Sequence, residues 1–195
     1  MNILKHALIV TALMAATALP STAQMTQPSG MGGMGGMAAS GGGRASPHDA
    51  INTRVGGKLV TIYYGRPLSR DRKIWGTLVP WEKAWRLGAD EATTLLLQSG
   101  IVIGGVTVPA GAYTLYMVPS ETGVSKLAIS KTIGAWGIPV DEKNDLARVD
   151  LKKEALDTAV DQLTLSLGRG TSANAGLLKI AWEKTQYSIE FTNAP

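Results

Sequence analysis

Residues 101–108 read IVIGGVTV, two short runs rich in β-branched side chains on either side of Gly104 and Gly105. A two-residue glycine turn supplies the positive φ angles that match the right-handed twist of a β-hairpin. The segment therefore predicts two antiparallel strands joined by a tight turn. Pro109-Ala110-Gly111 follows directly and predicts a second turn.

Short alternating segments continue on both sides of this hairpin. Residues 59–64 place Val60, Ile62 and Tyr64 on one face, and residues 113–118 place Tyr113, Leu115 and Met117 on one face. Comparable runs occupy residues 93–97, 126–130, 147–151, 162–167, 177–182 and 186–191. We therefore expect an all-β fold, an antiparallel β-sandwich or flattened barrel of about nine or ten strands with little helix.

Two local features complete this prediction. Pro80–Trp85 is the one helical candidate, because proline suits the first position of a helix. Glu183-Lys184-Thr185 is expected to be a short loop that pairs the last two strands. Trp182 is then expected to pack inward with Leu178 and Ile180, since aromatic side chains on a strand face usually fill cores.

The N-terminal region divides into two segments that precede the folded domain. Residues 1–23 are predicted to be a signal peptide, since Lys5 and His6 precede an apolar run and small residues end at Ala23. Residues 24–43 are predicted to be a disordered linker rich in Gly and Met. Its three evenly spaced methionines also suggest copper binding, a hypothesis weakened because no histidine or cysteine joins them. Residues 44–195 then form one domain of ordinary size, exported to the periplasm or medium with no transmembrane anchor after cleavage.

Composition excludes several classes of protein. The chain has no cysteine, so disulfides and thiolate chemistry are excluded. The net charge of +4 is interspersed along the chain, which argues against nucleic-acid binding. After signal cleavage only His48 remains of the two histidines, so we predict no metal site and no cofactor. The acidic stretch at residues 136–145 is predicted to be a solvated turn, because it lacks the ligand spacing of a calcium loop.

Residues 66–93 hold three of the five tryptophans together with several arginines, and we predict that they form a ligand-binding site. Tryptophan and arginine are favoured where a surface binds a partner. The predicted ligand-binding residues are Arg66, Arg72, Trp75, Trp81, Trp85 and Arg86. Two alternatives stay open for the arginines. They are internal latches if each pairs with a carboxylate, and an anion clamp if one is left without such a partner. The tryptophans, likewise, either stack on a sugar or plug one open end of the sandwich.

His48, Glu91 and Asp90 are the candidates for catalytic residues. A histidine titrates near neutral pH and can act as a general base. The alternative is a histidine hydrogen-bonded at the edge of the sheet. Asp90 and Glu91 are neighbours, and on an extended strand their side chains would point to opposite faces. We therefore expect each carboxylate to need a partner distant in the sequence, with Arg66, Arg72 and Arg86 as the candidates.

Several motifs together resemble a known family. They are Ser46-Pro47-His48, YGRP at 64–67, RKIWG at 72–76, VPW at 79–81, WRLGADEAT at 85–93 and PAGAYTL at 109–115. In combination they resemble DUF2911, a bacterial family of exported proteins with no assigned function. Leu87 and Asp90 stand where that family's pattern usually has threonine and asparagine. The resemblance implies export but no catalytic residues.

The sequence therefore favours an exported, non-catalytic β-sandwich that binds a ligand or partner, with carbohydrate or other cell-envelope material as the expected class. One alternative is a hydrolase or lyase outside the cytoplasm, with His48 as base and Glu91 or Asp90 as acid. The other is a structural envelope module in which the charged cluster is an internal brace.

Overall fold

The computed structural model describes residues 46–195, and every structural statement below concerns that part of the chain. The predicted signal peptide, the linker at 24–43 and the copper hypothesis for Met31, Met34 and Met37 lie outside the described residues.

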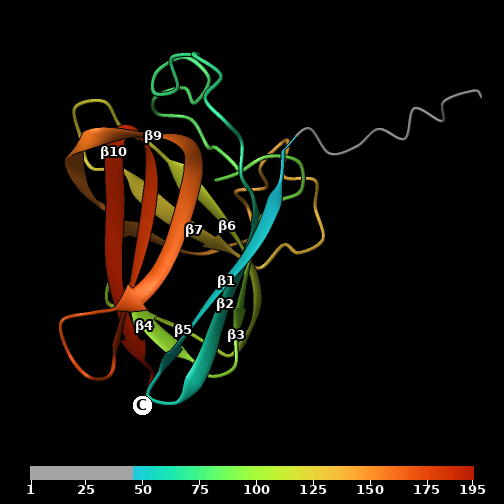
Figure 1. The fold of residues 1–195 in the computed structure, drawn as a ribbon. Helices are drawn as coiled ribbons and strands as arrows, with labels where there is room; N and C mark the ends of the chain where they lie inside the picture. Colours follow the sequence, from blue (N-terminus) through green and yellow to red (C-terminus); the bar gives the residue numbers. More distant parts are fainter. Residues whose placement is uncertain (1–45) are drawn as a thin grey trace, which may run out of the picture. The chain divides into compact units, whose positions relative to one another are not determined.

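Ten strands form two antiparallel sheets, which confirms the predicted all-β, sandwich-like fold (Figure 1). The larger sheet has the order β1 (His48–Val55), β2 (Lys58–Gly65), β3 (Thr93–Leu97), β6 (Gly111–Val118), β7 (Lys126–Ser130), β8 (Asp145–Asp150). The smaller sheet has the order β5 (Val106–Val108), β4 (Ile101–Ile103), β10 (Ala175–Asn193), β9 (Lys152–Arg169).

The hydrophobic core lies between the two sheets. Ile62 of β2 and Leu115 of β6 are buried from one side, and Leu178 and Phe191 of β10 from the other. A cavity of only about 20 Å³ is left between the side chains of the two sheets. Each fully buried aliphatic or aromatic side chain contributes roughly 1.5–3 kcal/mol, so this interior stabilises the fold without disulfides.

The glycine hairpin forms as predicted. Gly104 and Gly105 have φ angles of 55° and 79°, and they connect β4 to β5 in the expected register. Gly56 and Gly57 make the same kind of turn, with φ angles of 52° and 79°, between β1 and β2. Positive φ at both central residues is the turn geometry that glycine allows at least cost.

The predicted loop at Glu183-Lys184-Thr185 is wrong. Residues 175–193 form a single strand, β10, which pairs with β9 along most of its length. The register shifts on either side of Glu183, whose φ is 48°. The polar triplet is therefore a β-bulge, which kinks a strand locally without reversing it. Trp182, Leu178 and Ile180 are buried as expected.

The structure differs from the sequence analysis at two further places. The helix expected at Pro80–Trp85 does not form, since Glu82 adopts a φ of 59° that a right-handed helix cannot include. Strand β1 was not predicted, because only alternate residues of HDAINTRV are partly buried and few of them are apolar.

In residues 46–195 no helix has the length and hydrophobicity to span a bilayer.

The long segment between β2 and β3 leaves the larger sheet and returns to it. Residues 66–92, the green loop at the top of Figure 1, contain no regular strand although β2 and β3 are adjacent in the sheet. We call these residues the β2–β3 excursion. It contains most of the predicted site residues, so its docking on the sandwich positions the site.

Candidate functional site

The β2–β3 excursion forms a cleft with the loop at 137–142 and with Trp182 of β10. The cleft is open to solvent and has a volume of about 850 Å³. Ligand pockets in proteins commonly measure about 300–1,000 Å³, so the cleft is large enough for a small molecule or a short oligomer.

Backbone hydrogen bonds fix the start of the excursion to β9. The amide of Leu163 donates to the carbonyl of Pro67 at 2.9 Å, and the amide of Ser69 donates to the carbonyl of Asp161 at 2.8 Å. Further along, the amide of Ile74 donates to the Glu183 carboxylate at 3.1 Å. The β10 bulge thus supplies a hydrogen-bond acceptor that helps to fix the position of the excursion.

The end of the excursion is fixed to the larger sheet. Trp85 and Met117 exchange two backbone hydrogen bonds, of 2.7 and 2.8 Å. Gly65 lies against the backbone of Ala89, where an added Cβ would lie 2.2 Å from the carbonyl oxygen. Only glycine allows this close approach of the GADEAT loop to the end of β2.

Four tryptophans and a tyrosine form one aromatic cluster beneath the cleft. Trp75 is stacked on Trp81, with ring centroids 6.1 Å apart, and contacts Trp85 and Tyr187 edge to face. Trp85 is in turn stacked on Trp182 at 5.8 Å. Such offset-stacked and edge-to-face pairs are the favoured aromatic geometries.

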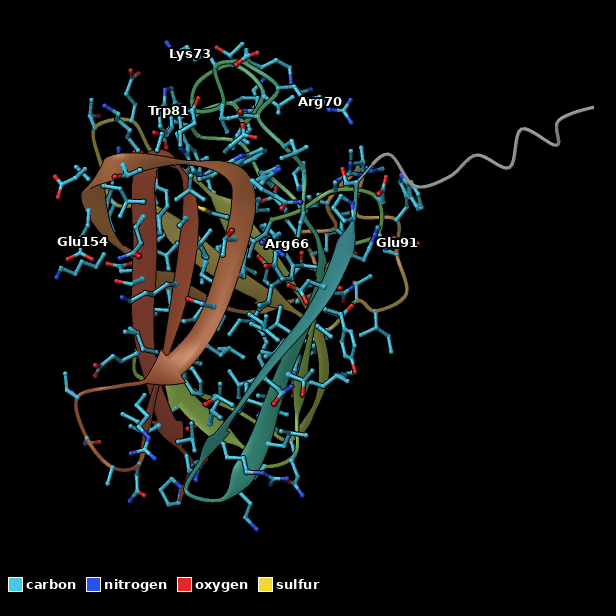
Figure 2. The ribbon with its side chains drawn as sticks, in the orientation of Figure 1. Arg66, Arg70, Lys73, Trp81, Glu91 and Glu154 are labelled. Atoms are coloured by element: carbon cyan, nitrogen blue, oxygen red, sulfur yellow. The ribbon has the colours of Figure 1, made fainter. Side chains whose placement is uncertain are left out.

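The three predicted tryptophans, Trp75, Trp81 and Trp85, have different environments. Trp75 is only 6% exposed and lies in the core with its indole N–H donated to the carbonyl of Trp182. Trp81 packs on it and lies beneath the Lys153 ammonium, near the bend of β9 and β10 (Figure 2). Of the three, Trp85 alone lines the cleft, together with Trp182. Trp75 and Trp81 pack on the hydrophobic core, whereas Trp85 is part of the cleft lining.

Arg72 and Arg86 both line the cleft, and both guanidinium groups donate to backbone carbonyls. Arg72 donates to Ser69 at 2.9 Å and to Leu68 at 3.0 Å. Arg86 donates to Gly88 at 3.4 Å and to Asp90 at 2.9 Å. Burial lowers the pKa of Arg86, and the negative charge of Asp90 partly offsets this effect. Neither arginine forms an ion pair with a carboxylate within residues 46–195.

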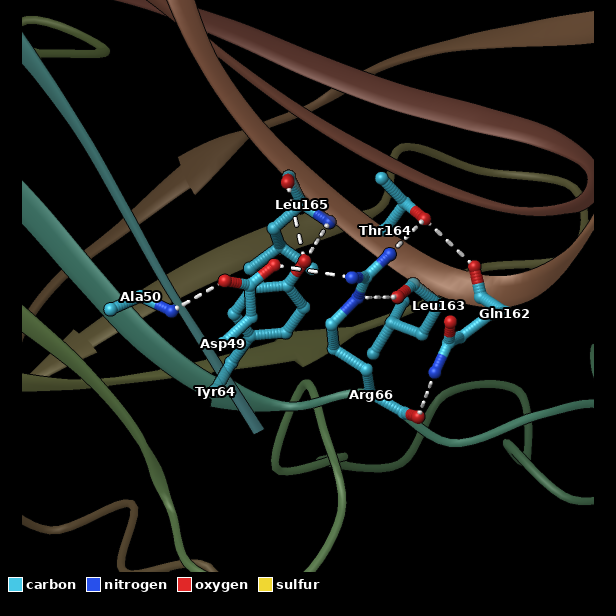
Figure 3. Close-up of polar contacts among 8 residues, drawn as sticks. All are labelled: Asp49, Ala50, Tyr64, Arg66, Gln162, Leu163, Thr164 and Leu165. Atoms are coloured by element: carbon cyan, nitrogen blue, oxygen red, sulfur yellow. Dashed lines mark hydrogen bonds and ion pairs between the residues drawn. The ribbon is translucent and has the colours of Figure 1, made fainter. Parts of the chain in front are cut away.

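Arg66 has a different environment from the other two arginines. It lies between β1 and β9, where it pairs with Asp49 at 3.2 Å and donates to Leu163 and Thr164 of β9 (Figure 3). Beside it, the Tyr64 hydroxyl accepts the amide of Leu165, while burial raises the Tyr64 pKa. Arg66 does not line the cleft and is a brace between the two sheets.

His48 is the first residue of β1, at the edge of the larger sheet. Its Nε2 lies 2.9 Å from a Glu91 carboxylate oxygen and 3.8 Å from the nearest Asp90 oxygen. Figure 2 shows Glu91 beside the start of β1. Asp90 lines the cleft, but neither His48 nor Glu91 does.

The expectation that Asp90 and Glu91 point to opposite faces is wrong. The two residues lie in a loop and not on a strand, and Asp90 has a φ of 64°. A left-handed residue turns the chain, so both carboxylates approach the same histidine. One Asp90 oxygen is buried and has no hydrogen-bond partner within residues 46–195.

The loop between β7 and β8 forms the remaining wall of the cleft through residues 137–140 and Glu142, which the sequence analysis does not assign to the site. Asp141 ties the loop together by accepting from Thr132 at 3.0 Å and from Asn144 at 2.9 Å. Arg148 pairs with Glu142 and Asp145, and also donates to the buried Tyr116 hydroxyl at 2.8 Å. The sequence pattern predicts a solvated turn for the acidic residues of this loop. No local pattern in the sequence indicates that Arg148 of β8 would hold them in place.

A two-sheet antiparallel β protein with a large, arginine-rich cleft beside a long excursion is the class that this fold and site define. The chain belongs to the DUF2911 family, described as a protein of unknown function, whose family model matches residues 46–191. No curated protein and no solved structure matches the chain in our comparisons.

Proposed function

We propose that the protein is an exported, non-catalytic binding module whose cleft takes carbohydrate or other cell-envelope material. The observation that carries this proposal is the presence of the half-buried Trp85 in the same open cleft as Arg72 and Arg86. An indole ring can stack against the face of a sugar, while guanidinium N–H groups donate to its oxygens.

The arginines favour binding because much of their donor capacity is unused. A guanidinium group has five N–H donors. Arg72 and Arg86 each use two of these for backbone carbonyls within the described residues, so three remain on each side chain. The carbonyl bonds hold the groups in place before a ligand arrives, which lowers the entropy cost of binding.

The position of His48 favours binding over catalysis. A hydrolase or lyase would need an acid and a base within hydrogen-bond reach of a bound substrate. His48 and Glu91 contact each other outside the cleft lining, and Asp90 is the one of these three candidate residues that lines the cleft. The proposed role of the cleft is therefore to hold a ligand without chemical conversion.

A glycan and envelope-extract binding screen on the purified protein tests this proposal. Trp85→Ala is expected to abolish binding, while Trp136→Ala, which removes a tryptophan that is 56% exposed outside the cleft, leaves binding unchanged. Because Trp85 also packs on Trp75 and Trp182, the melting temperature of each variant is measured, and Trp85→Phe is included as a milder change. The proposal fails if no glycan or extract component binds, or if folded Trp85 variants bind as well as the wild type.

A further inference from the structure

The cleft is positively charged. Five cationic side chains line it, namely Arg70, Arg72, Lys83, Arg86 and Arg148, against the three carboxylates of Glu82, Asp90 and Glu142. The lining therefore has two more cationic groups than anionic ones. A cleft lined by one sign of charge concentrates ligands of the opposite sign.

The positive charge is not distributed evenly. Arg148 is neutralised by Glu142 and Asp145. The carboxylate of Glu82 accepts from neutral donors, the Ser120 hydroxyl at 2.6 Å and the Glu121 amide at 3.3 Å. Arg72, Arg86 and the exposed Lys83 form no ion pair within residues 46–195, and the carboxylates of Glu82 and Asp90 line the cleft beside them.

The surroundings of these cations favour a carboxylate over a phosphate. A planar guanidinium fork can bind either anion with two parallel hydrogen bonds, so the groups beside it decide between them. Phosphate sites are commonly built on a helix N-terminus, whose amides point at the anion. Residues 46–195 contain no helix, so nothing of that kind lines the cleft in the described part of the chain.

Apolar side chains on the cleft lining complete the pattern. Leu68, Leu78 and Ile138 are 39%, 41% and 64% exposed, and all three line the cleft with Trp85. Exposed apolar and aromatic groups beside charged donors suit a ligand with both ring C–H faces and anionic substituents.

We infer that the ligand is an acidic oligosaccharide of the uronic-acid type, whose carboxylates bind Arg72 and Arg86 and whose sugar ring lies against Trp85. This inference rests on the proposed function and specifies its ligand class. Lys83 adds long-range attraction from the cleft rim.

The test compares matched tetrasaccharides by isothermal titration calorimetry on the purified protein. Three probes are used. They are a β-1,4-linked glucuronic acid tetrasaccharide, the neutral glucose tetrasaccharide of the same linkage, and that glucose tetrasaccharide carrying phosphate esters. We expect the uronate to bind at least about tenfold more tightly than the neutral sugar, because hydrogen bonds between charged groups are stronger. Its affinity is expected to fall as salt is added.

Arg86→Gln and Arg72→Gln are each expected to weaken uronate binding about tenfold and neutral-sugar binding less than about twofold. Arg54→Gln is the matched control, because Arg54 is exposed on β1 and outside the cleft. Melting temperatures show whether each variant is folded. Arg72→Gln and Arg86→Gln are measured separately, so each gives its own test of the inference.

The possible outcomes separate the inference from the proposed function. Equal affinity for uronate and neutral sugar, with both lost in Trp85→Ala, overturns the inference and leaves the proposed function intact. Tighter binding of the phosphate ester than of the uronate also overturns it. No binding of any of the three probes overturns the inference, while the extract screen still decides the proposed function.

Discussion

Replacing Arg66 with methionine should destabilise the protein while leaving the cleft intact. The substitution keeps an unbranched apolar stem but removes the guanidinium that joins β1 to β9. The lost contacts are the ion pair with Asp49 at 3.2 Å and the hydrogen bonds to Leu163 at 3.4 Å and Thr164 at 3.3 Å.

The magnitude follows from the exposure and length of these contacts. Asp49 is 39% exposed, so the ion pair is discounted for solvent to under about 1 kcal/mol. The other two bonds are long and accept at neutral oxygens, so each contributes roughly 0.5–1 kcal/mol. The total is about 2 kcal/mol, which corresponds to a fall in melting temperature of roughly 4–8 °C for a domain of this size.

Thermal unfolding followed by circular dichroism measures this effect, with Arg54→Met as the control. Arg54 is exposed on the same strand and donates one bond, to the carbonyl of Gly57. Its substitution should change the free energy of unfolding by less than about 0.5 kcal/mol. If Arg66→Met and Arg54→Met melt within about 1 °C of each other, the assignment of Arg66 as a brace between sheets is refuted.

Three other substitutions test separate features. Gly65→Ala should cost about 1–3 kcal/mol because its Cβ would meet the backbone of Ala89, whereas Gly168→Ala, with open space around it, should be nearly neutral in chemical denaturation. Burial and the bond to Asp145 raise the pKa of Tyr116 above its ordinary value of 10.0, so the stability that it adds is complete below that pH and lost at higher pH. Tyr116→Phe should therefore flatten the alkaline fall in stability, and parallel wild-type and variant curves would count against this reasoning. Hydrogen bonds from Lys143, Thr132 and Asn144 lower the pKa of Asp141 below its ordinary 3.8, so its contribution is present above that pH and is lost on acidification. Asp141→Asn should lose this acid-dependent step, seen as a smaller drop in melting temperature towards low pH.

The sequence predicts regular strands well where side-chain alternation and turn chemistry agree. Gly104 and Gly105 mark a hairpin in the sequence, and the structure confirms it. At Glu183 a polar triplet indicates a turn, yet tertiary pairing with β9 continues through it as a bulge. A bulge and a loop share the same residue preferences, so the local pattern cannot distinguish them.

The site was only partly predictable for a different reason. The density of tryptophan and arginine points to residues 66–93, and several residues of the β2–β3 excursion line the cleft. Which arginine faces the cleft depends on partners distant in sequence, such as Asp49 and Leu163 for Arg66. The approach of Asp90 and Glu91 to one histidine likewise depends on a left-handed residue in a loop, which a strand-based argument does not include.

The excursion begins and ends on adjacent strands, yet it also inserts Trp75 into the interior. A segment whose ends are neighbours could in principle be exchanged for another, as antibody loops are. Replacing this excursion would remove Trp75 from the core and destabilise the fold, because loss of a buried tryptophan costs roughly 3–5 kcal/mol of unfolding free energy. Redesign of selectivity is therefore confined to peripheral positions such as Leu78 and Lys83, which can vary without disturbing that anchor.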